Sequence, residues 1–168
     1  MPPAHPQSRI ILAPQPNTPP QGQMCVFLAG SIDQGRATTW QTLLGETLSA
    51  HPITILNPRR PDWDSSWVMD ISDPQFREQV EWELDMLEAA HVVALYLAPD
   101  SQAPISLLEL GLFARTGKVI VGCPEGYWRR GNVQIVCRRF GIELVDSLED
   151  LVEAVQRKVI ALGTGGKA

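Results

Sequence analysis

The chain has 168 residues, enough for one domain that buries about two-thirds of the surface of its unfolded chain. Its 44% apolar and 20% charged residues are ordinary for a globular protein, and its net charge of −5 argues against a nucleic-acid polymer as partner. Because no apolar run is long enough to span a membrane and no secretory signal is evident, we expect a cytoplasmic protein without a membrane partner. The three cysteines lack metal-ligand spacing, which favours free thiols and no metal site.

The N-terminal segment is rich in proline. Seven prolines fall within residues 1–23, which excludes a helix and favours an extended or disordered tail. Residues 9–13 within it have the pattern of a short edge strand. We therefore predict a tail over residues 1–23, one domain over residues 24–162 and a flexible tail over residues 163–168.

Apolar strand-like runs alternate with helical patterns through the domain. The predicted strands cover residues 24–29, 53–56, 91–97, 118–123 and 142–145. The predicted helices cover residues 37–50, 72–90, 131–140 and 148–162, together with a short one near residue 106. This alternation predicts an α/β fold of flavodoxin-like or Rossmann-like type, with a doubly wound, mainly parallel five-stranded sheet and helices on both faces. Neither a dinucleotide fingerprint nor a Walker loop is present.

Two loops in this pattern are candidate ligand sites. The glycine loop over residues 30–35 joins the first strand to a helix, an arrangement that either cradles an anion or only closes a βα unit. The loop after the second strand contains Trp63, which is suited to stacking on a planar ligand and equally suited to covering the core.

The helix over residues 72–90 begins with a capping-box pattern at Ser72. Its apolar stripe, which we expect to face the core, consists of Phe76, Val80, Leu84 and Leu87. Gln79, Glu83 and Met86 lie along one flank of this stripe. Glu83 is therefore either a half-buried carboxyl with a raised pKa or a solvated surface residue.

A single carboxylate, Glu109, lies in the otherwise apolar stretch over residues 104–111. It follows a strand, and open α/β sheets bind ligands at the carboxyl ends of their strands. The spacing of Ser106 and Glu109 also fits a capping box, with Ser106 as the N-cap and Glu109 at the third position of the helix. Local pattern alone leaves both interpretations open.

Five segments, taken in order, resemble the nucleoside 2-deoxyribosyltransferase family. They are Phe-Leu-Ala-Gly-Ser-Ile at 27–32, Trp-Gln at 40–41, Asn-Pro-Arg-Arg at 57–60, Gln-Val-Glu-Trp-Glu-Leu at 79–84 and Ser-Leu-Leu-Glu-Leu-Gly at 106–111. The resemblance extends over residues 26–145 and is to the branch with the Asn-Pro-Arg-Arg segment. It implies a flavodoxin-like fold, a role in nucleoside salvage, and exchange of the base of a 2′-deoxynucleoside for a free purine or pyrimidine base.

The resemblance also implies roles for individual residues. Glu109 corresponds to the glutamate that attacks C1′ of the deoxyribose, and Glu83 to the acid that contacts and protonates the leaving base. Asn132 corresponds to an asparagine that reaches a neighbouring subunit's site, which implies a homo-oligomer, either a dimer or a hexamer. The other substrate-binding residues that we predict are Ala29, Gly30, Ser31, Asn57, Arg59, Trp63, Gln79 and Ser106. No cofactor is implied.

The chain departs from the family beside the nucleophile. Better-known members carry a tyrosine at the position of Val26, so we expect Ser106 or Tyr96 to orient Glu109 instead. In a retaining double displacement through an oxocarbenium-like state, Glu109 is expected to be ionised and Glu83 partly protonated.

Two other functions fit the same residues. One is an N-glycosidase that passes the sugar to water, with Arg59 and Arg60 as ligands for the phosphate of a nucleoside 5′-monophosphate. The other is a nucleotide-binding sensor without catalysis.

Overall fold

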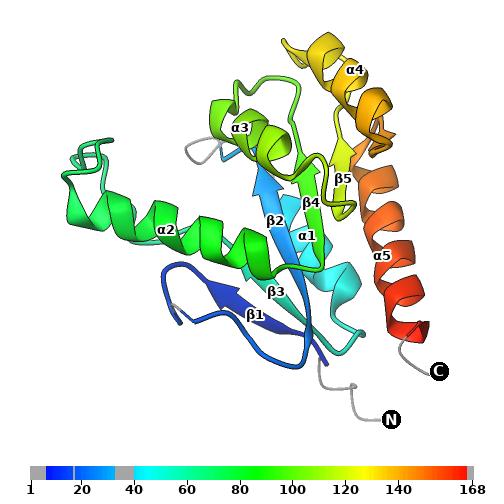
Figure 1. Ribbon diagram of the computed structural model, residues 1–168, viewed down its shortest axis with the longest axis horizontal. Helices are drawn as coiled ribbons and strands as arrows, with labels where there is room; N and C mark the ends of the chain where they lie inside the picture. The colour runs from blue at the N-terminus through cyan, green and yellow to red at the C-terminus, as the bar shows by residue number, and fades with distance from the viewer. Residues whose placement is uncertain (1–6, 17, 33–39, 166–168) are drawn as a thin grey trace.

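A computed structural model describes residues 7–16, 18–32 and 40–165. Within these residues six strands form one parallel sheet in the order β1-β3-β2-β4-β5-β6 (Figure 1). The strands are β1 (Arg9–Leu12), β2 (Met24–Gly30), β3 (Ile53–Asn57), β4 (Val92–Tyr96), β5 (Val119–Gly122) and β6 (Glu143–Val145). The helices are α1 (Trp40–Leu48), α2 (Pro74–Ala89), α3 (Pro104–Phe113), α4 (Arg130–Phe140) and α5 (Leu148–Thr164). The predicted first turn of α1, from residue 37, lies outside the described residues.

The predicted doubly wound α/β fold is confirmed, with six strands in place of five. β2, β4 and β5 are buried along almost their whole length, as continuous apolar runs require in a sheet covered on both faces. The sixth strand is β1, which lies in the predicted tail and pairs in parallel with β3. Its Ile11 is only 3% exposed, so the short apolar run at residues 10–12 gains one buried position by joining the sheet.

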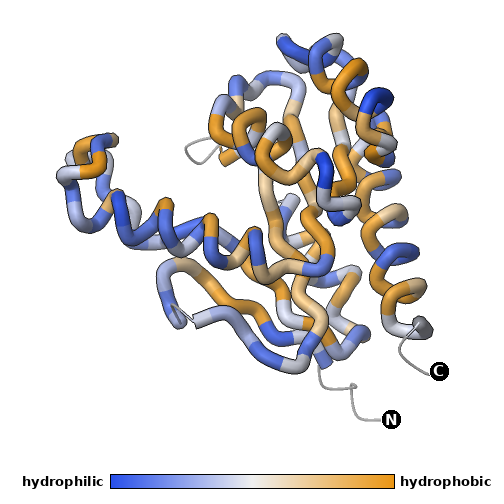
Figure 2. Tube along the Cα trace, in the orientation of Figure 1, coloured by the Kyte–Doolittle hydropathy of each residue, from blue (hydrophilic) through white to orange (hydrophobic). Residues whose placement is uncertain are grey.

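Two apolar layers lie on the two faces of the sheet. Side chains of α2, α3 and α4 cover one face, where they surround Phe27, Leu95 and Val121. Side chains of α1 and α5 cover the other, around Val26, Leu28 and Ile120. Figure 2 shows the apolar residues gathered along the central strands and alternating with hydrophilic ones around the helices.

Helix α2 differs from its prediction in both cap and buried face. The N-cap is Asp73, not Ser72, and its carboxylate accepts hydrogen bonds from the backbone N–H groups of Gln75 and Phe76. The expected core stripe was wrong in part, since Leu87 is buried but Leu84 is 39% exposed. The face turned to the sheet consists of Gln79, Trp82, Met86 and Leu87.

The contacts of Trp82 account for this rotation of α2. Its ring packs against Phe27 with centroids 6.4 Å apart, and its Nε1 donates to Pro16 O at 3.0 Å. The N-terminal end of α2 and the loop before it extend away from the sheet (Figure 1), where no strand lies beneath them. The apolar pattern of a helix does not show which part of the helix extends past the sheet, so it could not predict which apolar residues of α2 are buried.

Helix α3 begins three residues earlier than the capping-box interpretation requires. Pro104 is its first residue, a position that suits the fixed φ of proline, and Ala103 is the N-cap with φ of 45°. Ser106 therefore lies inside the first turn, and the interpretation of Ser106 as the cap was wrong. Glu109 lies in the second turn, beyond the range over which a helix N-terminus strongly favours a negative charge.

Candidate functional site

The carboxyl ends of β2 and β4 form the topological switch point of the sheet, because the chain leaves β2 towards β3 and later returns to β4 on the other side. At this point Gly30 pairs with Tyr96. Gly30 has φ of +139°, and a Cβ there would overlap the backbone oxygen of Tyr96. Only glycine fits, and this is the usual place for a ligand in such a sheet.

Ser31 joins the loops that follow these two strands. Its Oγ accepts a hydrogen bond from Ala98 N at 2.9 Å and bonds to the hydroxyl of Ser101, while its own N–H donates to Tyr96 O at 2.9 Å. Because Ser31 is 1% exposed and its hydroxyl is engaged, its side chain supports the loop. Ala29 is equally buried, so we expect Ala29 and Ser31 to contact a ligand through backbone atoms.

Glu109 lies on the inward face of α3, beside the buried Leu110 and Phe113, and is 8% exposed. No donor among residues 7–16, 18–32 and 40–165 hydrogen-bonds to its carboxyl group. Burial raises its pKa to about 8, and the negative charge of Glu83 contributes to the rise. The two carboxyl groups therefore act on each other, although they come from different helices.

Glu83 is the more readily ionised member of this pair. Burial raises its pKa to about 6, while a hydrogen bond from Gln79 Nε2, 2.8 Å long, lowers it. Between these two values the pair carries one proton. Burial favours the neutral form of both groups, while the donor on α2 favours ionisation of Glu83.

The loop between β3 and α2 is built largely on its own polar contacts. Arg60 pairs with Asp62 at 2.7 Å, and its guanidinium carbon lies 4.7 Å from the centre of the Trp67 ring. Trp63 packs edge-on against Trp67, with ring centroids 4.9 Å apart, and is 43% exposed. Asp62 thus engages one side of the Arg60 guanidinium, while its buried Nη1 has no hydrogen-bond partner among the described residues.

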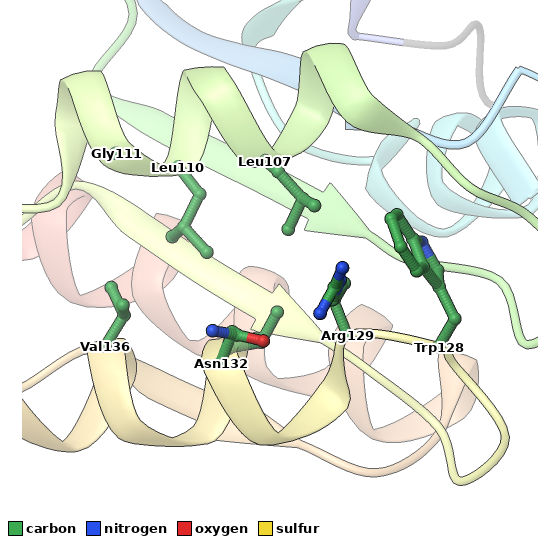
Figure 3. A pocket seen from close by; sticks show the side chains of 8 residues that line it. Leu107, Leu110, Gly111, Trp128, Arg129, Asn132 and Val136 are labelled. Atoms are coloured by element: carbon green, nitrogen blue, oxygen red, sulfur yellow. The ribbon is translucent and has the colours of Figure 1, made fainter.

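Asn132 lies apart from the carboxyl pair, in a groove of about 330 Å³ between α3 and α4. Figure 3 shows Leu107 and Leu110 of α3 facing Asn132 and Val136 of α4 across this groove. Glu109 does not line it. Within one chain the structure thus brings Gln79, Glu83 and Glu109 into one region, and Asn132 into another.

A family model described as nucleoside 2-deoxyribosyltransferase like matches residues 23–127, more than half of the chain. The chain belongs to this family.

A solved structure described as a conserved protein from Enterococcus faecalis V583 is similar in fold, with a TM-score of 0.56. It is 14% identical and aligns over 81% of this chain and 99% of its own. A comparison with curated proteins gave no match. The family match includes both carboxyl residues and ends before Asn132.

The position at which other members of the nucleoside 2-deoxyribosyltransferase family were expected to carry a tyrosine points away from Glu109. Val26 is fully buried against α1 and α5, on the opposite face of the sheet. Tyr96 also packs on that face, 5.7 Å from Trp40 between ring centroids. The expectation that Tyr96 orients Glu109 was therefore wrong.

Several supports of the site were not identified from the sequence. Tyr127 OH and Trp128 Nε1 both donate to Gln102 O, at 2.6 and 3.0 Å, and so hold the loop that leads into α3. Nothing in the sequence indicated this contact across 25 residues. By contrast, the spacing of Gln79 and Glu83, four residues apart on a helix, was a usable signal for their hydrogen bond.

Two further findings concern membrane-spanning helices and metal-binding clusters. Across the part of the chain that the structure describes, none of the helices combines the length and apolar character needed to cross a membrane. The same residues contain no cluster of three or more histidine, cysteine or acidic side chains arranged to hold a metal ion.

Proposed function

We propose that the protein transfers the 2-deoxyribosyl group of a 2′-deoxynucleoside to a second purine or pyrimidine base. The observation that carries this proposal is a pair of interacting carboxyl groups, the half-buried Glu83 and the buried Glu109, in a chain that belongs to this family. Such a pair suits the chemistry of a glycosidic bond, where one carboxylate stabilises an oxocarbenium-like state and the other handles a proton.

The proposed reaction is a double displacement. A Glu109 oxygen forms a bond to C1′ as the bond from C1′ to the base nitrogen breaks, and the electron pair of that bond goes to the base, which takes a proton from Glu83. An incoming base then attacks C1′, the ester bond to Glu109 breaks, and Glu83 accepts the proton of the incoming nitrogen. Two displacements retain the configuration at C1′.

One proton on the carboxyl pair is the state that this sequence requires. The pair carries one proton between pH of about 6 and about 8, the two pKa values of its members. Reaction proceeds from the form in which this proton lies on Glu83, because Glu109 must be an anion to attack C1′.

We also propose that the protein acts as a homo-oligomer. Helix α3 is apolar on its outer side, where Ile105, Leu108 and Leu112 are each more than half exposed. A helix that is apolar all round is usually covered on every side. The adjacent groove contains Asn132, and a second copy seated on this surface is consistent with an Asn132 that serves a neighbouring site.

The experiment that tests the proposed activity is a base-exchange assay. The protein is incubated at pH 7 with a 2′-deoxynucleoside and a different free base, and the products are separated by chromatography. We expect the exchanged nucleoside with the original anomeric configuration. Glu109→Ala is expected to lose exchange by at least about 100-fold, because it removes the attacking group. Glu81→Ala, which alters an exposed glutamate of α2, is the matched control and should retain activity.

Other outcomes distinguish the alternative functions. Free base and free sugar without an exchanged nucleoside would identify a hydrolase. Binding of a nucleotide without turnover would identify a sensor. Full exchange by Glu109→Ala would refute the assignment of the nucleophile.

A further inference from the structure

Gln79 is an unusual residue for the interior of this fold. It lies on the face of α2 that is turned to the sheet and is only 3% exposed, among Trp82, Met86 and Leu87. A buried amide is costly unless its polar atoms are hydrogen-bonded. Its contacts should therefore explain why a polar side chain occupies this position.

Both N–H groups of the Gln79 amide are engaged. Nε2 donates to Pro58 O at 3.0 Å and to Glu83 Oε1 at 2.8 Å. The reversed amide orientation would place an oxygen against these two acceptors, so the hydrogen bonds fix the orientation of the amide. Gln79 thus connects the loop after β3 with the carboxyl group of Glu83.

The loop that carries Pro58 is itself held by a hydrogen bond to Asn57. Asn57 is the last residue of β3, and its Oδ1 accepts the backbone N–H of Arg59 at 3.0 Å. This bond closes a turn around Pro58, whose carbonyl group is the one that Gln79 binds. The contacts form one series from Asn57 through Pro58 and Gln79 to Glu83.

We infer that Gln79 is a positioning residue: it holds Glu83 Oε1 and leaves Oε2 as the oxygen that exchanges a proton with the base. This inference rests on the proposed function and deepens it. Asn57 acts through the same connection, by setting the position of the Pro58 carbonyl. Both residues were predicted to bind substrate, but the N–H donors of Gln79 are already used within the chain.

The first test measures Glu83 without relying on activity. The protein is labelled with ¹³C at the side-chain carboxyl carbons of glutamate, and the Glu83 signal is identified by its absence in Glu83→Gln. In Gln79→Met we expect the titration midpoint of Glu83 to rise by about half a unit to one unit, because a donor to the ionised form is lost. An unchanged midpoint would overturn the inference.

The chain offers a matched control for this substitution. Gln41 on α1 is also a buried glutamine, 6% exposed, and within the described residues its Oε1, like that of Gln79, accepts no hydrogen bond. It lies on the opposite face of the sheet, with α5. Gln41→Met should leave the Glu83 midpoint and the exchange activity unchanged, which separates the local effect from general loss of a buried amide.

Kinetics then test the positioning role. In the exchange assay we expect Gln79→Met to lower kcat by about 10- to 100-fold, with KM changed by less than about threefold. A raised KM with unchanged kcat would overturn the inference and identify Gln79 as a substrate-binding residue.

A second pair of variants keeps the inference testable if Gln79→Met folds poorly. Asn57→Ala removes the acceptor that shapes the turn and should shift the Glu83 midpoint in the same direction. Asn57→Asp keeps an acceptor oxygen and should restore it. Equal midpoints in these two variants would overturn the role of Asn57. If the wild-type protein exchanges no bases, the proposed function fails, and the midpoint alone decides whether Gln79 positions Glu83.

Discussion

At the scale of single residues, the ionisation of Glu109 opposes folding. The carboxyl group is buried among apolar side chains, so the folded protein favours its neutral form. Its pKa rises from an ordinary 4.5 to about 8, and the folded state therefore binds more protons than the unfolded state between these values. The contribution of Glu109 to stability is present below pH of about 4.5 and is lost as the pH rises through about 8.

This linkage predicts a pH-dependent effect of Glu109→Gln. The glutamine stays neutral, so we expect a Tm above that of the wild-type protein by at least about 3 °C at pH 8.5, and a much smaller difference at pH 5. Thermal unfolding followed by circular dichroism at both pH values measures it. Glu81→Gln, at an exposed site, should show no such dependence, and a Glu109→Gln difference equal at the two pH values would contradict the linkage.

At the scale of elements, α2 is fixed at its C-terminus by a residue from outside the helix. Lys118 Nζ donates to the carbonyl groups of Leu87, Glu88 and Ala90, at 2.5, 3.0 and 3.1 Å. These belong to the carbonyl groups that the end of a helix leaves without partners in the helix. A cation at this end also interacts favourably with the helix dipole. Lys118 therefore anchors the helix that carries Gln79 and Glu83.

We expect Lys118→Met to lower the free energy of unfolding by about 1–3 kcal/mol, because it removes charged hydrogen bonds to partly buried carbonyl groups. Urea denaturation measures this loss. Lys158→Met is the matched control, since Lys158 donates to a single carbonyl group, that of Gly117, at 2.6 Å. Equal losses in the two variants would show that the triple contact adds nothing.

The helices and strands also show which structural features the sequence patterns could predict. β2, β4 and β5 could be predicted because each is a continuous apolar run, and this pattern alone requires burial on both faces. The buried face of α2 could not, because it depends on Trp82 reaching Phe27 and Pro16, both distant in the chain. The start of α3 was misjudged because Pro104 and the Ser106 capping pattern compete for the same turn.

The candidate site was predictable to a similar degree. The family resemblance indicated Glu83 and Glu109 as a pair. In the structure they are close enough for the charge of Glu83 to raise the pKa of Glu109. The degree of burial that raises the pKa of Glu109 was not predictable, because it depends on how α3 packs against the sheet. The spacing of Gln79 and Glu83 indicated their hydrogen bond, but nothing local indicated the bond from Gln79 to the carbonyl group of Pro58.

At the scale of the whole molecule, the exposed apolar side of α3 is the surface on which we expect two copies of the chain to associate. Ile105, Leu108 and Leu112 follow one another along this side at helical spacing and are 58%, 59% and 56% exposed. Large apolar patches on a protein surface usually mark an interface. The face formed by α2, α3 and α4 is thus the one on which we expect a second copy to pack.

Size-exclusion chromatography with light scattering tests this assembly. We expect the wild-type protein to have a mass that is a multiple of the 18.6 kDa chain. Leu108→Glu should shift it to the mass of one chain, since a charge would be buried in the interface. Ile160→Glu, at a half-exposed position of α5, is the control and should keep the wild-type mass. A wild-type mass of a single chain would rule out the oligomer.

The pairing of β1 with β3 has a consequence for solubility during folding. Without β1, the outer edge of the sheet would be β3, an apolar strand with four consecutive buried residues and a row of unpaired backbone donors and acceptors. Such an edge is a template for the addition of strands from other molecules. β1 replaces it with a strand of four residues that begins with an arginine and is followed closely by Pro14 and Pro16. β1 thus covers the edge of β3. The new edge of the sheet is short, and the prolines that follow it disfavour the addition of a strand from another molecule.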